Sequence, residues 1–514
     1  MSLINVSNLT FYYDGSFTNV FENASFAIDT NWKLGFIGRN GKGKTTFLKL
    51  LMGDYSYRGV IDASVYFDYF PYEIDKKNES LPASDFIYDL KPGCEEWKVI
   101  CELSKLKETA DILYRPFNTL SPGEKTKILL AVLFSGENEF LLIDEPTNHL
   151  DVKAREIVKE YLAAKKGFIL VSHDRELLDE CTDHCLVLNR KTIEVCNGNF
   201  TSWWEQKQRK DRAAISENEK HKKEIEKLHK ASQRTSQWAD KNEKTKIGFD
   251  PLKEPERNIS TRSYIGAKTK KMQSRVKQME NRINREIEEK EGLLVDIEKP
   301  VDLKLFNLKY HKSLLIRVND CSIRYKDSIE PVFKNLGFDI HQGERVAICG
   351  ANGSGKSTII KVILCKLDIP FEEGDGKEFD AFVEAGEFEV AKGLKISYLG
   401  QETGYLSGNL KDYCHENGLD FSMFLTLLRQ LDFERSQFEK NMEDFSQGQK
   451  KKVLLATSLL TPAHLYIWDE PLNYIDVFSR IQIENLILKY KPTLLFVEHD
   501  NTFSEKIATK IVKI

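Results

Sequence analysis

The segment Gly38-Arg39-Asn40-Gly41-Lys42-Gly43-Lys44-Thr45-Thr46 has the pattern G-x-x-x-x-G-K-[ST]. A short apolar run, KLGFI at 33–37, precedes it, and a helical pattern, FLKLL at 47–51, follows it. Between a strand and a helix, this pattern forms a loop whose backbone N–H groups surround phosphate oxygens. We therefore predict that Lys44 reaches the β- and γ-phosphates of a nucleotide and that Thr45 binds Mg²⁺. The other predicted nucleotide contacts in this loop are Gly38, Asn40, Gly41, Gly43 and Thr46.

The same pattern returns 312 residues later, as Gly350-Ala351-Asn352-Gly353-Ser354-Gly355-Lys356-Ser357. Lys356 and Ser357 take the places of Lys44 and Thr45. An internal repeat of domain size predicts an α/β fold with two tandem P-loop nucleoside triphosphatase domains. The further nucleotide contacts predicted here are Gly350, Asn352, Gly353, Gly355 and Thr358.

An acidic pair follows an apolar strand in each half: Asp144-Glu145 after FLLI, and Asp469-Glu470 after LYIW. Such a pair suits a carboxylate that holds a metal and a second one that polarises water. A core strand with a solvated acidic end is a common alternative, but the phosphate loop upstream favours catalysis. His173 and His499 stand at the next strand ends. An isolated histidine is usually structural, but these two complete the set and are predicted to be catalytic with Glu145 and Glu470.

Between the phosphate loop and the acidic pair, each half has a polar helix start, LSPGE at 120–124 and FSQGQ at 445–449. Ser121 and Gly123 offer a hydroxyl and backbone N–H groups to a second phosphate-contacting surface, as Ser446 and Gly448 do in the other half. These motifs are offset by 325 residues rather than 312, so the second half holds thirteen extra residues. We predict that they lie within 371–390.

Together these motifs resemble those of the ATP-binding cassette (ABC) ATPases, in order and spacing. The resemblance implies that Tyr13 and Tyr325 stack on adenine and that Asn148 to Asp151 form the D-loop. It also implies that Glu124 and Gln449 belong to the signature motifs, and that Gln401 is the Q-loop glutamine and a Mg²⁺ ligand. Tyr72 occupies the Q-loop position of the first half, which departs from the family pattern.

The family resemblance further implies that the two cassettes close head to tail. One ATP would lie between Lys44 and Ser446, and the other between Lys356 and Ser121. Both sites should hydrolyse ATP with Mg²⁺, held by Thr45 and Asp144 in one site and by Ser357, Gln401 and Asp469 in the other. The expected state is a monomer with intramolecular pairing of the cassettes.

Composition narrows the class of protein. The chain has 514 residues, 41% hydrophobic and 30% charged, and no run of about 18 apolar residues that could cross a bilayer. Its start shows no secretory signal, and its nine cysteines include no C-x-x-C pair, so we expect buried, reduced thiols in a cytoplasmic protein. Cys181, His184 and Cys185 lie close in sequence, but one short segment makes a poor zinc site.

The middle of the chain, 203–300, is polar and predicted to be an antiparallel helical hairpin between cassettes at 1–202 and 301–514. Residues 244–285 hold twelve Lys or Arg against four Asp or Glu, a local charge of +8, whereas the whole chain carries −4 and the remainder −12. Either this is an ordinary solvated helix pair or it contacts nucleic acid. An apolar stripe of narrow helical spacing is predicted on the second helix, formed by Met272, Val276, Met279, Ile283 and Ile287.

The predicted interhelical loop, 244–264, combines basic and apolar side chains. Its apolar residues either pack on one another or on the helices, or they become buried only on docking. Basic flanks with an aromatic tip suit structured RNA. The residues predicted to contact the ribosome or its drug site are Lys244, Lys246, Ile247, Phe249, Leu252 and Lys253.

Two cassettes, no membrane segment and a charged helical linker resemble the ABC-F proteins. Only 48 residues separate Tyr72 from Ser121, which leaves little room for an arm, and the chain ends fifteen residues after His499. These features resemble the antibiotic-resistance ABC-F proteins of the Lsa/Vga type. The resemblance implies that the protein binds the bacterial 70S ribosome near ribosomal RNA and the P-site tRNA, with its linker inserted from the tRNA exit site. It would then displace lincosamide, pleuromutilin and streptogramin A drugs.

Three alternatives stay open at this level. The chain could be a general translation factor that acts on stalled ribosomes without affecting drug sensitivity. It could be the ATPase subunit of an exporter with a separate membrane partner, although this leaves the basic hairpin without a role. DNA-associated ATPases form the third class.

Overall fold

The computed structural model describes residues 2–13, 19–244 except 138, 149 and 190, several positions between 270 and 285, and 305–514 except 327, 352, 370–378, 432 and 434. By its internal contacts the chain divides into one unit that contains both cassettes (Met1–Trp203 and Pro300–Ile514) and a second unit, Trp204–Lys299. Within the described residues, no helix has the length and apolar character needed to span a membrane.

The first cassette is built on a six-stranded sheet of order β5-β6-β7-β3-β8-β9, in which all neighbours are parallel except the pair β8-β9. The strand β7, Phe168-Ile169-Leu170-Val171, is buried along its whole length, as expected of a strand covered on both faces. The other strands are β3 (Lys33–Ile37), β5 (Tyr66–Phe70), β6 (Glu139–Asp144), β8 (His184–Leu188) and β9 (Ile193–Asn197). The sheet is accompanied by helices α1 (Lys44–Met52), α4 (Pro122–Leu133), α5 (Val152–Ala163) and α6 (Arg175–Cys181).

A separate antiparallel sheet of order β2-β1-β4 completes the nucleotide-binding part of this cassette. It consists of β1 (Leu3–Phe11), β2 (Phe21–Asp29) and β4 (Arg58–Asp62). In β1 the buried residues Ile4 and Val6 alternate with exposed residues, which is the pattern expected of a strand with one covered face. A helical part lies before α4 and contains α2 (Ala83–Leu90), α3 (Glu96–Lys105) and two short 3-10 helices, η1 (Ala110–Tyr114) and η2 (Phe117–Thr119).

The second cassette repeats this plan. Its main sheet has the order β14-β15-β16-β12-β17, and all the neighbouring strands run parallel. These strands are β12 (Arg345–Cys349), β14 (Ile396–Leu399), β15 (Leu465–Asp469), β16 (Leu494–Val497) and β17 (Lys510–Lys513). The antiparallel sheet, of order β11-β10-β13, consists of β10 (Leu314–Tyr325), β11 (Phe333–His341) and β13 (Ala381–Val390). The helices are α9 (Lys356–Lys366), α10 (Leu410–Glu416), α11 (Phe421–Gln430), α12 (Gln447–Leu460), α13 (Val477–Tyr490) and α14 (Asn501–Ile507), with 3-10 helices η4 (Arg435–Gln437) and η5 (Met442–Asp444).

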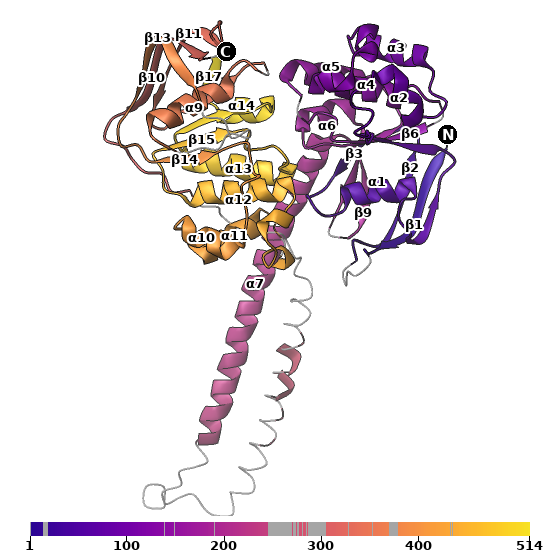
Figure 1. Ribbon diagram of the computed structural model, residues 1–514. Coiled ribbons are helices and arrows are strands. Elements are labelled where there is room, and N and C mark those ends of the chain that lie inside the picture. The colour runs from indigo at the N-terminus through magenta and orange to yellow at the C-terminus, as the bar shows by residue number, and fades with distance from the viewer. Residues whose placement is uncertain are drawn as a thin grey trace, which may run out of the picture. The chain divides into compact units, whose positions relative to one another are not determined.

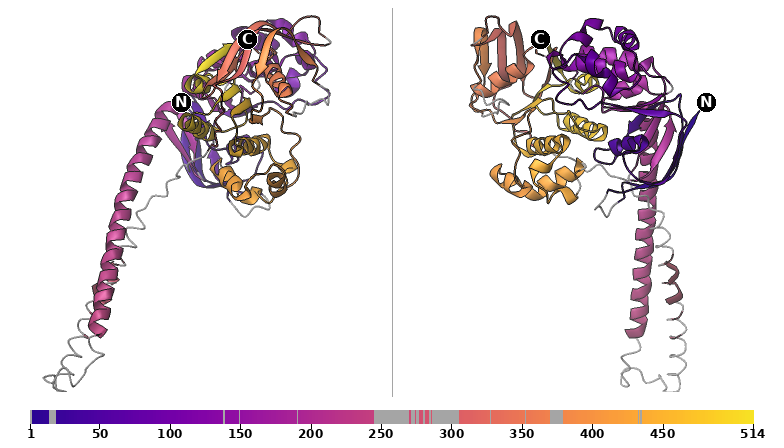
Figure 2. Two further views of the ribbon diagram at one scale, coloured as in Figure 1. Left: turned by 90° about the vertical axis from the view of Figure 1, so that its left-hand side faces the viewer. Right: turned by 45° about the vertical axis from the view of Figure 1, so that its right-hand side comes forward.

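Figure 1 and the right-hand view of Figure 2 show that, in the second cassette, the antiparallel sheet and helices α10 and α11 lie at opposite ends. The parallel sheet lies between them and supplies the strand ends that carry the predicted site. Its core includes Tyr466 and Trp468 of β15, both fully buried. Part of the predicted insertion is visible, because β13 has ten residues whereas its counterpart β4 has five.

The linker unit begins in a single continuous helix, α7 (Phe200–Lys244), of 45 residues. At 1.5 Å per residue this helix is about 68 Å long. None of its described side chains after Trp203 is buried, but half-buried residues recur at helical spacing at Ala214, Asn218, His221, Ile225 and Leu228. One face of α7 is therefore partly covered.

The described positions between 270 and 285 are helical, in agreement with a second linker helix. The predicted stripe on it needs correction at one position. Ile283 is buried, as expected, but Met279 is 54% exposed and does not belong to a covered face. Met272, Val276 and Ile287 lie outside the described residues, as do residues 245–264 of the predicted loop.

Candidate functional site

The first phosphate loop connects β3 to α1, and two glycines allow its backbone to turn there. Gly43, at the N-terminus of α1, has φ 108°, and a Cβ atom on it would lie 2.6 Å from the side chain of Val20. Gly41 also has positive φ, 75°. Lys44 turns back over the loop, and its Nζ donates to the carbonyl oxygen of Gly38 at 2.7 Å and to Oδ1 of Asn40 at 3.2 Å. These residues therefore form one compact group at the N-terminus of the helix, and their contact with a nucleotide stays a prediction.

The second phosphate loop has the same construction. Gly355 precedes α9 with φ 96°, and Lys356 Nζ donates to the carbonyl oxygens of Gly350 and Ala351 at 2.9 and 2.8 Å. Gly353 also has positive φ, 79°. Asn352 lies outside the described residues.

The acidic pair Asp144-Glu145 lies at the carboxyl end of β6, directly opposite the start of α1. The Thr45 hydroxyl donates to Oδ2 of Asp144 at 2.7 Å. The fold thus brings a hydroxyl and a carboxylate from distant segments of the chain into direct contact. Glu145 has φ 52°, a conformation that a residue other than glycine adopts only where its surroundings impose it. Nε2 of His173 lies 3.3 Å from Oε1 of Glu145.

The second site also has an acidic pair next to a hydroxyl and a histidine, and Gln401 contacts its acidic strand end. Gln401 Nε2 donates to Oδ1 of Asp469 at 3.0 Å and lies 3.5 Å from the Ser357 hydroxyl. Glu470 has φ 48°, and one of its carboxylate oxygens lies 3.3 Å from Nε2 of His499. Asn473 donates to the other carboxylate oxygen of Glu470 at 2.6 Å.

The two glutamates differ in electrostatics. Burial, together with the negative charge of Asp144, raises the pKa of Glu145 to about 8. Burial also opposes ionisation of Glu470, but the hydrogen bond and charge of His499, the charge of Lys451 and a hydrogen bond from Asn473 outweigh it, and the pKa of Glu470 is lowered. Burial and the charge of Lys44 lower the pKa of His173, so its imidazole is neutral at neutral pH. The two halves of the chain thus place the same residue types in different electrical environments.

The predicted signature residues stand at helix N-termini. Ser121 caps α4 and accepts a hydrogen bond from the Glu124 N–H at 3.2 Å, and Glu124 Oε2 accepts from the Ser121 N–H at 2.7 Å. This reciprocal arrangement is a capping box, and Ser446 with Gln449 repeats it at α12. Gly123 is in the first turn of α4. At the corresponding Gly448, a Cβ atom would lie 2.8 Å from the carbonyl oxygen of Tyr474, so this close approach requires glycine.

The two tyrosines predicted to stack on adenine lie beside the phosphate loops. The hydroxyls of Tyr13 and Thr46 are 2.6 Å apart, and those of Tyr325 and Thr358 are 2.9 Å apart. Tyr13 is 42% exposed, which leaves part of its ring accessible to a base. Their stacking on adenine stays a prediction.

Strand register assigns the Q-loop positions. Phe70 pairs with Ile143 in the first cassette and Leu399 pairs with Trp468 in the second, so Tyr72 corresponds to Gln401. The Tyr72 hydroxyl, however, donates to Asp68 at 2.6 Å. A different residue, Tyr69, places its hydroxyl 3.3 Å from Oδ2 of Asp144. The contact that Gln401 makes with its acidic strand end is therefore made in the first cassette by Tyr69, which the sequence alone did not single out.

The first phosphate loop also contacts the second cassette. Asn40 Nδ2 donates to the carbonyl oxygen of Tyr474 at 2.8 Å, and Arg39 lies over the Phe478 ring at 5.9 Å from its centroid. Phe478 in turn meets Trp203, at the start of α7, with ring centroids 6.0 Å apart. A short series of side chains therefore joins a phosphate loop to the first turn of the linker helix.

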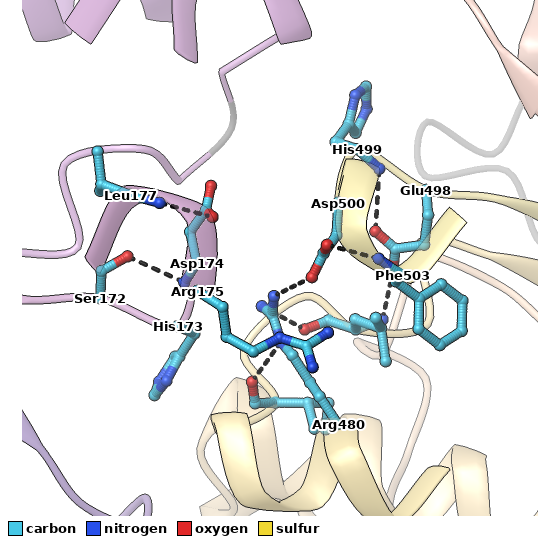
Figure 3. A network of polar contacts seen from close by, with 12 residues as sticks. Ser172, His173, Asp174, Arg175, Leu177, Arg480, Glu498, His499, Asp500 and Phe503 are labelled. Atoms are coloured by element: carbon cyan, nitrogen blue, oxygen red, sulfur yellow. Dashed lines mark hydrogen bonds and ion pairs between the residues drawn. The ribbon is translucent and has the colours of Figure 1, made fainter. Parts of the chain in front are cut away.

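Further contacts surround the segments that carry the two histidines (Figure 3). Arg480 of α13 donates to Oδ2 of Asp500 at 3.2 Å and to the backbone carbonyl oxygens of Leu472 and Ile475. Arg155 of the first cassette donates to the carbonyl oxygen of His499 at 3.3 Å. Arg155 and Arg480 thus connect the histidine segment of the second cassette to the first cassette and to the second D-loop.

Two of the residues in these contacts, Arg155 and Arg480, belong to none of the sequence motifs. Asn473 belongs to the second D-loop, which reads Leu472-Asn473-Tyr474-Ile475-Asp476. The zinc alternative gains no support: in the part of the chain that the structure describes, no three His, Cys, Asp or Glu side chains group as metal ligands. The predicted tip residues Lys246, Ile247, Phe249, Leu252 and Lys253, and the side chain of Lys244, lie outside the described residues.

Comparison with known proteins agrees with this geometry. The family model described as ABC transporter matches residues 21–148 and 333–473, together more than half of the chain. The ribosome protection protein VmlR of Bacillus subtilis (strain 168) is 29% identical over 98% of this chain and 85% of its own length. The ATP-binding protein Uup of Buchnera aphidicola subsp. Acyrthosiphon pisum is also 29% identical, over 99% of this chain and 80% of its own length.

Solved structures share the fold. The archaeal ribosome recycling factor aABCE1, solved in complex with the ribosomal stalk protein aP1, superposes with a TM-score of 0.59 at 17% identity, covering 98% of this chain and 87% of that one. A structure described as RNase-L Inhibitor superposes with a TM-score of 0.58 at 16% identity, covering 99% and 87%. The chain therefore belongs to the ABC transporter family of ATP-hydrolysing P-loop proteins and carries two of its ATPase domains in tandem.

Proposed function

We propose that this protein is an ABC-F-type ATPase that binds the bacterial ribosome in the cytoplasm and protects it from antibiotics of the peptidyl-transferase centre. Its linker enters from the tRNA exit site, next to ribosomal RNA and the P-site tRNA, and displaces the drug. The expected drug classes are lincosamides, pleuromutilins and streptogramin A compounds. ATP binding favours the bound form, and hydrolysis releases it.

The observation that carries this proposal is the linker helix α7 and the charge that follows it. A helix of 45 residues whose described side chains remain largely exposed after Trp203 is not part of a cassette core. It leads into residues 244–285, which carry a net +8 in a chain of net −4. Positive charge attracts the phosphates of RNA at long range. The similarity to a protein named for ribosome protection points to the ribosome as the source of that RNA.

The ATP sites supply the switch. Lys44 and Lys356 bind the β- and γ-phosphates, and Glu145 and Glu470 orient the attacking water next to His173 and His499. Thr45 with Asp144, and Ser357 with Asp469 and Gln401, offer the oxygen ligands that Mg²⁺ prefers. Bound there, Mg²⁺ neutralises charge on the phosphates.

Each site is proposed to close with the signature of the other cassette, Ser446 against the Lys44 site and Ser121 against the Lys356 site. The contact of Asn40 with the backbone of Tyr474 supports the first of these pairings. ATP then binds the closed form more tightly than the open form, and this difference in affinity is what makes hydrolysis a switch.

The decisive test combines ribosome binding with drug susceptibility. Glu145→Gln/Glu470→Gln should hold ATP without hydrolysis and co-sediment with 70S ribosomes in ATP but not in ADP. Expression of the unaltered protein in a sensitive bacterium should raise the inhibitory concentrations of the three drug classes. Absence of ribosome association would refute the proposal. Ribosome association without any change in susceptibility would instead support a general translation factor, and recovery with membranes would support an exporter subunit.

The linker tip has its own test. Deleting residues 247–252, or replacing Phe249, should abolish drug protection and leave basal ATP hydrolysis largely intact. Loss of hydrolysis in the deletion variant would show that this segment supports the cassettes structurally.

A further inference from the structure

Lys451 is a buried lysine in the second turn of α12, the helix that begins with the second signature motif. Its side chain is only 2% exposed, an unusual position for an ammonium group, which is costly to remove from water unless it is hydrogen-bonded. Nζ of Lys451 donates to the carbonyl oxygen of Gly400 at 2.9 Å and to the carbonyl oxygen of Asp469 at 3.3 Å. One side chain thus joins a helix to two separate strand ends.

Both carbonyl groups belong to the ATP site of Lys356. Gly400 directly precedes Gln401, and the carboxylate of Asp469 accepts the hydrogen bond from that glutamine at 3.0 Å. Lys451 therefore bridges the Q-loop and the acidic strand end, which follow two neighbouring strands of the sheet. Because Glu470 follows Asp469 in the chain, its position depends on the same anchor.

The first turn of α12, one turn before Lys451, makes a different contact. Ser446 caps the helix, and Gly448 in its first turn lies against the D-loop carbonyl of Tyr474. That carbonyl accepts the hydrogen bond from Asn40, which belongs to the phosphate loop of Lys44. The same helix thus contacts the surroundings of one ATP site through its first turn and those of the other site through Lys451.

The first cassette has no such anchor at the corresponding place. The 325-residue offset of the signature motifs aligns Lys451 with Thr126, whose hydroxyl donates to the carbonyl oxygen of Pro122 in its own helix at 3.0 Å. There, the lysine that links the helix to the strands is Lys91, which donates to the carbonyl oxygen of Leu133 at the far end of α4 and to Asp68. A lysine therefore connects the signature helix to the strands near the start of α12 in the second cassette, but at the end of α4 in the first.

We propose that Lys451 is a positioning residue that couples the two ATP sites, by holding the Q-loop and acidic strand end of the Lys356 site in register with the signature helix that closes on the Lys44 site. Movement of α12 when ATP binds at Lys44 is then transmitted to Gln401 and Glu470. In the first cassette, Thr126 replaces Lys451, so movement of α4 when ATP binds at Lys356 is not transmitted to the Glu145 site through such a contact. This coupling depends only on ATP hydrolysis, so it stands whether or not the protein acts on ribosomes.

The test measures each site separately in the full-length protein. In the Glu145→Gln background only the Glu470 site hydrolyses ATP, and in the Glu470→Gln background only the Glu145 site does. Single-turnover rates at saturating ATP are compared for Lys451→Met, which keeps the length of the side chain but removes its donors, and for Thr126→Met, the matched change in the first cassette. We expect Lys451→Met to slow the Glu470 site at least tenfold and the Glu145 site about threefold, with less than twofold change in the dissociation constant of ATP.

Thr126→Met should change both rates less than twofold. Rates of Lys451→Met within twofold of the parent in both backgrounds would overturn the proposal, and an effect confined to the Glu470 site would overturn the coupling. Lys451→Gln retains a donor that can reach one carbonyl, so it should recover part of the rate at both sites. If Lys451→Met does not fold, the same two rates are measured for Lys451→Gln. The proposal then requires that Lys451→Gln slow single turnover at the Glu470 site at least threefold.

Discussion

Arg175 of the first cassette and Glu484 of the second form a buried ion pair between segments 309 residues apart in the sequence. Both guanidinium ends donate to the carboxylate, one of them at 3.2 Å, and Lys506 donates to it at 2.7 Å. Glu484 is fully buried. The internal repeat places Lys159 where Glu484 would be, and Lys159 instead pairs with acidic residues of its own cassette. The two cassettes therefore contact each other through chemically different surfaces on the two sides of the repeat.

Removal of Arg175 should be strongly destabilising, since it leaves Glu484 buried with Lys506 as its remaining cationic partner. For Arg175→Met we expect a loss of roughly 3–5 kcal/mol in the free energy of unfolding, measured by urea denaturation of the full chain. Asn501 is the counterpart of Arg175 in the repeat and is exposed. Asn501→Met should cost less than about 0.5 kcal/mol. An Arg175→Met loss below about 1 kcal/mol would show that the pair does not hold the cassettes together.

Replacement of the two first-cassette tyrosines should separate catalysis from stability. Tyr69→Phe removes the hydroxyl beside Asp144, and a lost hydrogen bond of about 1 kcal/mol predicts a roughly fivefold slower single turnover at the Glu145 site. Tyr72→Phe removes only the bond to Asp68, so we expect an unchanged rate and a stability loss of about 1 kcal/mol. If Tyr72→Phe slowed the single turnover and Tyr69→Phe did not, Tyr72 rather than Tyr69 would be the residue that acts in place of the Q-loop glutamine.

The contact of Asn473 with Glu470 predicts a pH effect. The amide donates to the ionised carboxylate and helps keep its pKa low, so Asn473→Ala should raise that pKa. Glu470 acts as a base when ionised, and its activity is lost as pH falls through its pKa. The acid limb of the rate profile should therefore move to higher pH in the Glu145→Gln background. Asn148→Ala, the counterpart in the first D-loop, should leave this limb in place.

Thiol reactivity should follow burial. Burial raises the pKa of Cys181 and of Cys185 to about 12, and their thiols lie 3.4 and 3.2 Å from backbone carbonyl oxygens. Cys101 and Cys365 are exposed, contrary to the expectation that the cysteines are buried. Iodoacetamide at pH 8 should modify Cys101 and Cys365 first, because the thiolate is the reactive form. Rapid labelling of Cys181 or Cys185, detected by peptide mass spectrometry, would contradict the native packing of this segment.

The phosphate loops and the acidic strand ends could be predicted from the sequence because each depends on a few consecutive residues with local backbone requirements. The contact of Thr45 with Asp144 followed from the family pattern as well. Tyr69 could not be found, because its role depends on which way Tyr72 turns next to Asp68. The Arg175–Glu484 pair and the anchor made by Lys451 join distant segments, and no local pattern marks such contacts.

The packing of Arg39, Phe478 and Trp203 has a mechanical consequence. Arg39 belongs to a phosphate loop and Trp203 to the first turn of α7, with the Phe478 ring between them. A continuous helix of about 68 Å amplifies any change at its base, so a tilt of roughly 5° there displaces its other end by about 6 Å. A small tilt at the first turn of α7 would therefore move the remote end of this helix by a distance comparable to a whole side chain.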